Sequence, residues 1–235
     1  MFEYLGYVIM TNENHFLKGK PRMINEVIER LRQQLYEESD PQALCSNHTL
    51  QLSQELNNFI NFHNRITSGF NQEHSSNTNV HATILQNILD ISFEERLELP
   101  FLQCDEALRT GEWVKIGLVC SLLNSISEKY GWEAVHYIGE LVPDKCYFPE
   151  TITNFQESIE ELNNAYYFNH RSNVYIGEYL PYTGTKNEIL LFCHTPHYFT
   201  EFNHGLIKGL SKKYNQSLKV SVLTREHGGQ FKIVV

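Results

Sequence analysis

The stretch Ser53-Gln54-Glu55-Leu56-Asn57 lies inside a pattern, from Ile24 to His63, that predicts a two-helix hairpin. Mostly apolar side chains recur at helical spacing through this stretch and beyond it. They form a stripe that consists of Leu52, Leu56, Phe59, Ile60 and His63. This stripe predicts a helix from about His48 to Arg65. Gln54, Asn57 and Asn61 would then point away from the stripe, toward the outside of the hairpin.

A second apolar stripe precedes the first one and predicts a helix that begins at Met23. Its members are Ile24, Val27, Ile28, Leu31 and Leu35. Ser39-Asp40-Pro41 ends this helix, because proline disfavours the helical conformation in the residue before it. Two helices this short are marginal alone, so we expect an antiparallel pair that buries both stripes between its members.

The rest of the chain predicts a second domain, and the fold class is therefore α+β. Residues 1–22 form an N-terminal extension, 23–65 the hairpin, 66–79 a polar linker, and 80–235 a domain of helices followed by a small β-sheet with one crossing helix. We expect its helices over 80–90, 92–98, 112–130 (capped by Gly131), 132–141 (stopped before Pro143), 149–166 and 199–214. We expect its strands over 173–180, 188–193, 218–223 and 230–235.

Composition excludes several classes of function. The formal net charge of −9 and the pI of about 5.6 speak against nucleic-acid binding, which needs clustered Lys and Arg. The sequence has no apolar run of transmembrane length and no secretory signal at its start. Its five cysteines include no CxxC pair, which suits reduced thiols. We therefore expect a cytoplasmic protein that binds neither nucleic acid nor membrane.

The outward face of the second predicted helix presents amides where a solvated helix usually presents Lys and Glu pairs. An amide donates and accepts hydrogen bonds at once, which suits docking onto a polar site. From the residues alone, a docking face and an ordinary hydrophilic surface both remain open.

Two segments, Ile28–Leu35 and Leu52–Ile60, resemble the stage-zero sporulation regulatory protein E family of aspartyl-phosphate phosphatases. Members of this family are helical hairpins with the signature Ser-Gln-Glu-Leu-Asp on the second helix. Residues Ser53 to Leu56 match the first four positions, and the fifth is Asn57 where the family has Asp. The resemblance covers residues 23–64 only.

The resemblance implies that the hairpin removes the phosphoryl group from the aspartate of a sporulation response regulator. Gln54 would be the catalytic residue, because a glutamine can orient an attacking water. The partner-binding residues would be Ser53, Glu55, Asn57, Asn58 and Asn61. The chain itself would need no cofactor, since Mg²⁺ belongs to the phosphorylated regulator. Asn57 in place of Asp leaves a second reading open, in which the hairpin binds a regulator without hydrolysing its phosphate.

The second domain carries weaker signals. Cys193, His194, His197 and His204 could bind zinc or haem iron, but their spacing matches no standard motif, and we expect no metal. The order of elements loosely resembles haem–nitric-oxide-binding and 4-vinyl-reductase-type sensor domains, in architecture only. This implies a sensor that biases the hairpin through an unidentified ligand or through a homodimer. The many aromatic residues could line a ligand pocket or fill the core.

Overall fold

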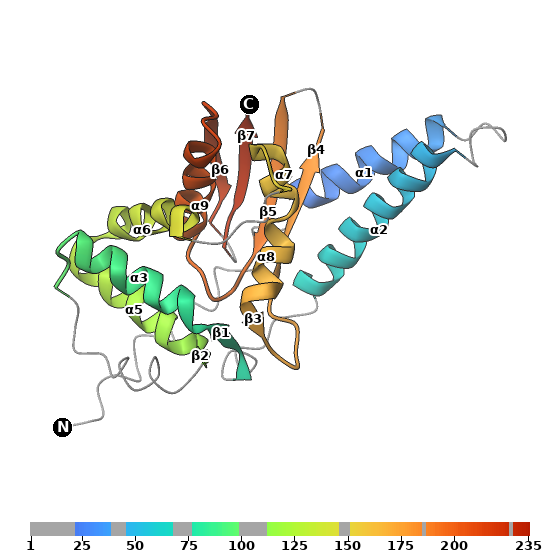
Figure 1. The fold of residues 1–235 in the computed structure, drawn as a ribbon. Coiled ribbons are helices and arrows are strands. Elements are labelled where there is room, and N and C mark those ends of the chain that lie inside the picture. Colours follow the sequence, from blue (N-terminus) through green and yellow to red (C-terminus); the bar gives the residue numbers. More distant parts are fainter. Residues whose placement is uncertain are drawn as a thin grey trace. The chain divides into compact units, whose positions relative to one another are not determined.

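The computed structural model describes residues 22–38, 46–67, 77–98, 112–145, 151–184, 187–225 and 228–235. The chain divides into two compact units, 1–70 and 71–235 (Figure 1). The described residues form eight helices and two antiparallel sheets, which confirms the α+β class and the N-terminal helix pair. Residues 1–21 of the expected extension and 68–76 of the expected linker lie outside the described residues.

The first unit is a hairpin of α1 (Arg22–Glu37) and α2 (Asn47–Thr67). The predicted stripe of α1 is buried at Ile24, Val27, Ile28 and Leu31. The predicted stripe of α2 is partly wrong: Leu56, Ile60 and His63 are only half-buried, and the buried residues are Thr49, Leu52, Phe59 and Phe62. The two phenylalanine rings are the largest apolar groups of α2, and the buried side of the helix is centred on them.

Polar contacts at the tip of the hairpin fix the start of α2. The Ser46 hydroxyl accepts a hydrogen bond from the backbone N–H of Thr49 at 3.0 Å, which caps the helix. The Glu38 carboxylate, just beyond α1, lies 2.8 Å from Nδ1 of His48 and accepts from the Thr49 hydroxyl at 3.3 Å. These contacts join the end of one helix to the beginning of the next.

The second unit contains α3 (Ala82–Glu94), α5 (Ile116–Tyr130), α6 (Trp132–Lys145) and α9 (Thr200–Lys213). In α6 and α9, glycines stand where the two backbones come close. A Cβ on Gly205 would overlap the backbone of His136, and one on Gly209 would overlap that of Glu140. The close packing of this helix pair therefore depends on residues that lack a side chain.

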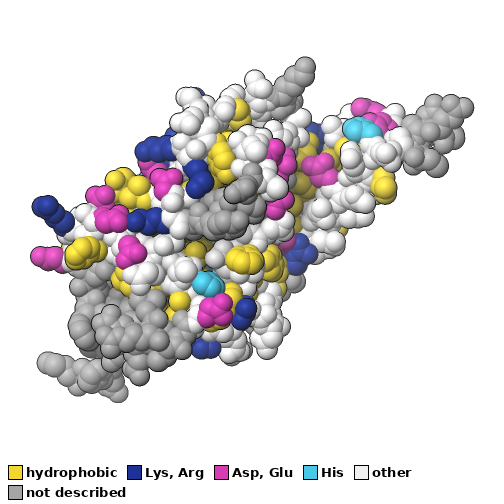
Figure 2. Space-filling view, viewed as in Figure 1, with side chains coloured by type: hydrophobic (Ala, Val, Ile, Leu, Met, Phe, Trp, Pro, Cys, Tyr) yellow, Lys and Arg dark blue, Asp and Glu magenta, His cyan; other side chains and the backbone are white. Residues whose placement is uncertain are grey.

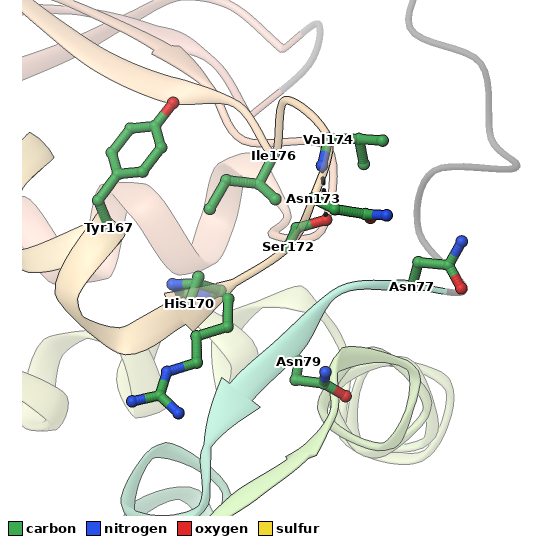
Figure 3. A pocket seen from close by; sticks show the side chains of 9 residues that line it. Asn77, Asn79, Tyr167, His170, Ser172, Asn173, Val174 and Ile176 are labelled. Carbon is green, nitrogen blue, oxygen red and sulfur yellow. Dashed lines mark hydrogen bonds between the residues drawn. The ribbon is translucent and has the colours of Figure 1, made fainter.

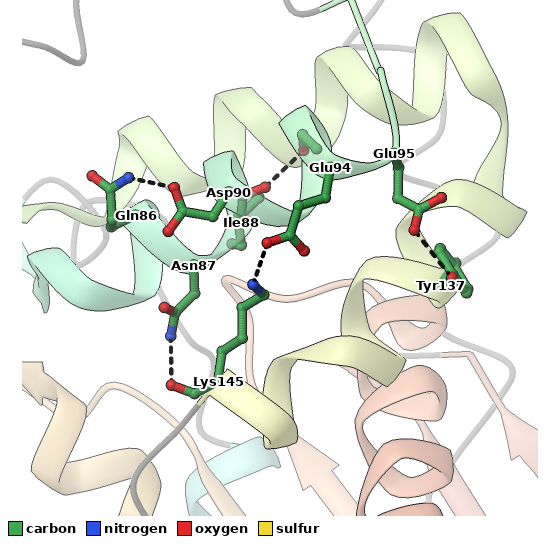
Figure 4. Close-up of polar contacts among 9 residues, drawn as sticks. Gln86, Asn87, Ile88, Asp90, Glu94, Glu95, Tyr137 and Lys145 are labelled. Atoms are coloured by element: carbon green, nitrogen blue, oxygen red, sulfur yellow. Dashed lines mark hydrogen bonds and ion pairs between the residues drawn. The ribbon is translucent and has the colours of Figure 1, made fainter.

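Helix α3 is tied to α6 by polar groups on the surface (Figure 4). Nζ of Lys145 lies 2.8 Å from Oε1 of Glu94, and the Lys145 carbonyl accepts from Nδ2 of Asn87 at 3.3 Å. The Tyr137 hydroxyl donates to Glu95 at 3.2 Å. Exposed pairs of this kind contribute little stability, so the apolar core, which includes Leu85, Ile88, Leu122 and Leu123, must hold these helices together.

The main sheet contains β4 (Glu178–Thr183), β5 (Glu188–His194), β6 (Lys219–Thr224) and β7 (Gln230–Val234). Its order is β4-β5-β7-β6 and all its pairs are antiparallel. Helix α9 connects β5 to β6, as the prediction of one crossing helix required (Figure 1). Alternate residues of β5, namely Ile189, Leu191 and Cys193, contribute to the core.

A second sheet was not predicted. It joins β1 (Asn79–His81), β2 (Trp113–Lys115) and β3 (His170–Arg171) in the order β2-β1-β3. Strands of two or three residues are too short to show an alternating pattern in sequence. The predicted helices over 80–90 and 112–130 are therefore wrong at their starts, where β1 and β2 lie instead.

Other boundaries also differ from the prediction. Helix α3 ends at Glu94, so the separate helix over 92–98 is wrong. Helix α6 continues through Pro143 to Lys145, because a proline so close to the end interrupts only the last turn. The predicted helix over 149–166 is two helices, α7 (Phe155–Glu160) and α8 (Leu162–Asn169), and β4 begins only at Glu178. Gly131 does cap α5, with a φ of 84°.

Candidate functional site

Helix α2 presents the predicted site residues on its outer surface. Gln54, Asn57, Asn58 and Asn61 are exposed, and Ser53 and Glu55 are half-buried. Gln54, Asn57 and Asn61 lie at i, i+3 and i+7, so they share one row along the helix. The structure thus brings these amides together on one face, where a partner can reach them.

None of the residues of α2 that are classed as exposed has a carboxylate, ammonium or guanidinium group, and Glu55 and Arg65 are half-buried. The exposed residues of the helix are Asn47, His48, Leu50, Gln51, Gln54, Asn57, Asn58, Asn61, Asn64 and Thr67. In Figure 2 the visible side of the hairpin is mostly white, the colour of uncharged polar side chains and backbone. By contrast, the exposed residues of α1 include five charged ones, Glu26, Glu29, Arg30, Arg32 and Glu37. An uncharged surface is unusual in a chain with a net charge of −9 and can approach an anionic site without repulsion.

Glu55 is the one acid of α2, and it lies beside this surface. Burial raises the pKa of its carboxyl group above the ordinary value.

The four Cys and His residues considered as metal ligands are Cys193, His194, His197 and His204. Among the described residues, no three His, Cys, Asp or Glu side chains are grouped as metal ligands. Cys193 is buried in β5, and burial raises the pKa of its thiol. His194 packs on the Tyr175 ring at 5.8 Å, whereas His204, on α9, meets the ring of His136 at 4.7 Å. Burial lowers the pKa values of His197 and His204 to about 4.

The second unit contains a buried histidine that sequence reasoning missed. His170 is 6% exposed, with Nδ1 2.7 Å from the Tyr166 carbonyl and Nε2 2.9 Å from the Tyr198 hydroxyl. A carbonyl only accepts, so Nδ1 carries the proton, and Nε2 of the neutral ring accepts from Tyr198. Burial lowers the pKa of His170 to about 4. Because 28 positions separate His170 from Tyr198, no local sequence pattern could predict the hydrogen bond between them.

A second buried network lies close to the first. Asn203, fully buried on α9, donates to the Thr195 hydroxyl and to the Gly228 carbonyl, both at 2.8 Å. Its own carbonyl oxygen accepts from the Tyr179 hydroxyl at 2.7 Å. Every polar atom of the amide is therefore used, which fixes the end of β5 and the β6–β7 connection against α9.

Two hollows adjoin these residues. An apolar cavity of about 80 Å³ lies between the tyrosines and the helices, and its lining includes Tyr166, His170, Tyr179, Tyr198, Phe202 and Leu206. A larger, open and polar hollow of about 730 Å³ lies on the surface (Figure 3), and its lining includes Asn77, Asn79, Tyr167, Arg171, Ser172 and Asn173. The aromatic residues thus serve both expected roles, since they fill the core and line a small cavity.

Comparison with known proteins finds a match for the hairpin. Residues 24–62 match the family model described as Spo0E like sporulation regulatory protein. This confirms the resemblance inferred from Ile28–Leu35 and Leu52–Ile60, and the match covers less than a fifth of the chain. No curated protein matches the sequence.

Solved structures that match the chain are H-NOX proteins, the domains whose layout the second half was expected to resemble. One, from S. oneidensis in the Fe(II)NO ligation state, has a TM-score of 0.49 and 11% identity over 66% of this chain and 98% of its own. The unliganded Fe(II) H-NOX protein from K. algicida has a TM-score of 0.45 and 13% identity over 66% and 94%. An oxygen-binding H-NOX domain related to soluble guanylate cyclases has a TM-score of 0.45 and 14% identity over 65% and 90%.

In the described part of the chain, no helix is both long enough and apolar enough to span a bilayer.

Proposed function

We propose that this chain regulates sporulation by removing the phosphoryl group from the aspartate of a response regulator, with Gln54 as the catalytic residue. One observation carries the proposal: Gln54 is exposed on an uncharged helix face, inside the segment that matches the Spo0E-like family. A partner can reach Gln54 on this face, and the amide can form hydrogen bonds with a phosphoryl group or a water.

The hydrolysis of an aspartyl phosphate requires few functional groups from the hairpin. The oxygen of a water attacks phosphorus, the bond from phosphorus to the aspartyl oxygen breaks, and the aspartate leaves as a carboxylate. The amide of Gln54 has an oxygen that accepts a hydrogen bond from the water and an NH₂ that can donate to a phosphoryl oxygen. An amide is not a base at neutral pH, so the proton of the water leaves with the phosphate. Mg²⁺ bound by the regulator would neutralise charge on the phosphoryl group.

Asn57 supports a second candidate function. It occupies the exposed position where the family signature has Asp, so the face lacks one negative charge. In this alternative the hairpin binds a regulator and does not hydrolyse its phosphate. Asn57→Asp separates the two candidates, because a non-catalytic hairpin would gain hydrolysis from the change, whereas a catalytic one already hydrolyses.

The second unit would bias the activity of the hairpin by binding a small molecule. In this proposal the ligand is a molecule of only a few atoms, because the apolar cavity beside Tyr166 and Tyr198 has a volume of about 80 Å³. Haem, which H-NOX structures are described with, does not fit this cavity. The cavity is smaller than the ~150 Å³ that holds a benzene molecule, and both ring nitrogens of His170 are engaged.

The test is loss of phosphate from a purified sporulation response regulator phosphorylated on its aspartate. We expect Gln54→Ala to slow the loss by roughly 10²-fold, the usual effect of removing a group that positions a reactant in phosphoryl transfer or stabilises its charge. Gln34→Ala is the matched control, because Gln34 is an exposed glutamine of α1, the other helix of the hairpin. Equal rates for wild type and Gln54→Ala would remove Gln54 from the mechanism.

A further inference from the structure

Leu50 is the one apolar residue among the exposed positions of α2. Its exposed fraction is 57%, and every other exposed residue of the helix is polar. A single exposed leucine is common on protein surfaces, so its position must decide whether it has a role.

Leu50 lies in the same row of α2 as the candidate site residues. Leu50, Gln54, Asn57 and Asn61 lie at i, i+4, i+7 and i+11, which is one continuous row on the outer side of α2. Leu50 precedes Gln54 by one helical turn, or about 6 Å along the axis. A partner that contacts Gln54 from this side would also cover Leu50.

We infer that Leu50 is the apolar anchor with which the hairpin docks onto the regulator, beside the phosphorylated aspartate. The inference rests on the proposed function, because it names a binding residue for the same face. The binding energy of an interface is concentrated in a few side chains that become fully desolvated. The amides of this row supply geometry and hydrogen bonds, and Leu50 is the one side chain in it that gains energy by leaving water.

The absence of charge from the row is compatible with a response regulator as the partner. The aspartyl phosphate of a regulator is surrounded by negative charge from the phosphoryl group and from the acidic residues that bind Mg²⁺. The row is free of charged groups, although the whole chain carries a net charge of −9. Such a row does not repel an anionic partner surface, whereas a surface built for a basic partner would present acids.

The experiment uses the full chain and two substitutions. Leu50→Ser removes the apolar contact, and Leu50→Asp places a carboxylate in the row. Both should fold, since Leu50 is more than half exposed and an acid in the first turns of a helix is favourable. Tyr36→Ser is the matched control, because Tyr36 is an 81% exposed apolar residue on α1, the charged helix of the same hairpin.

The readouts are steady-state dephosphorylation and binding to the regulator loaded with beryllofluoride, a stable mimic of its phosphoryl group. We expect Leu50→Ser to raise KM and Kd about tenfold with kcat unchanged, the effect of losing part of a buried leucine. Leu50→Asp should raise both further, and Tyr36→Ser should leave them unchanged. Unchanged KM and Kd in both Leu50 variants would overturn the inference.

Failure of the proposed function gives a different pattern. If wild type and Gln54→Ala release phosphate equally while the Leu50 variants lose binding, Leu50 is confirmed as the anchor and the catalytic role fails. If Leu50→Asp only converts a dimer of this chain to monomers without changing KM, the leucine contacts a second copy and the inference is wrong.

Discussion

His170 is kept neutral by its position in the second unit. Its ring is buried, its Nδ1 proton is donated to a carbonyl, and its Nε2 accepts from Tyr198, an arrangement that suits the uncharged form. The pKa of His170 falls from an ordinary 6.5 to about 4 because burial penalises the imidazolium ion.

This shift makes the stability of the second unit depend on pH. Above pH 6.5 the ring is neutral in the folded and unfolded chains, so it adds no pH dependence. Between pH 6.5 and about 4 the unfolded chain binds a proton that the folded chain does not, and the free energy of unfolding falls. We expect His170→Gln to reduce the loss between pH 7 and pH 5 by up to about 2 kcal/mol, measured by urea unfolding at both pH values.

An unchanged pH dependence in the His170→Gln variant would show that the ring is accessible to protons in the folded state. His197 and His204, whose pKa values are also lowered to about 4, would then account for the whole effect.

For single residues, the sequence could predict which side chains of a helix are exposed, but not which residues of distant elements form hydrogen bonds. Gln54, Asn57 and Asn61 are exposed as expected because helical periodicity fixes which side each residue takes. The contacts of His170 with Tyr198, and of Tyr179 with Asn203, depend on how distant elements pack. No local pattern encodes them.

Among the elements, the pair α6 and α9 makes the most specific prediction. Gly205 faces the backbone of α6 so closely that any side chain must push the helices apart. We expect Gly205→Ala to lower the free energy of unfolding by about 1–3 kcal/mol, the usual cost of overpacking, as measured by denaturant unfolding.

Gly117→Ala provides the control for that substitution. Gly117 lies in the first turn of α5, and no atom lies within 4 Å of the Cβ it would gain. Alanine favours the helix there and should raise stability by up to about 1 kcal/mol. A Gly205→Ala protein as stable as wild type would mean that α6 and α9 can separate at little cost.

Element types were easier to predict than element boundaries. Long apolar stripes identified α1, α2, α5 and α9, because a stripe reports a buried face directly. The sequence pattern predicts helix starts where the short strands β1 and β2 lie, because three residues are too few to show a strand period. Pro143 was expected to end α6, yet the helix tolerates it in the last turn. The stripe of α2 was misplaced because the bulk of Phe59 and Phe62, more than the average period, decides which side is buried.

At the scale of the whole molecule, the two units divide the proposed function. In this proposal the hairpin contributes the face that carries Gln54, and the second unit contributes the cavity and the buried polar networks. The α+β class and the two-part organisation followed from the change in pattern after residue 79. The cavity did not, because it is lined by residues from separate elements, such as Tyr166, Tyr198 and Leu206.

In the proposed function the hairpin hydrolyses the aspartyl phosphate of the regulator, and does not merely bind over it. The most direct measurement is the lifetime of aspartyl phosphate on the regulator when the full chain is present at one-twentieth of the regulator concentration. We predict complete loss of phosphate, faster than the regulator loses it alone, because each chain turns over many regulators. A lifetime that is unchanged at this ratio, and unchanged or longer at equal concentrations, would contradict the account.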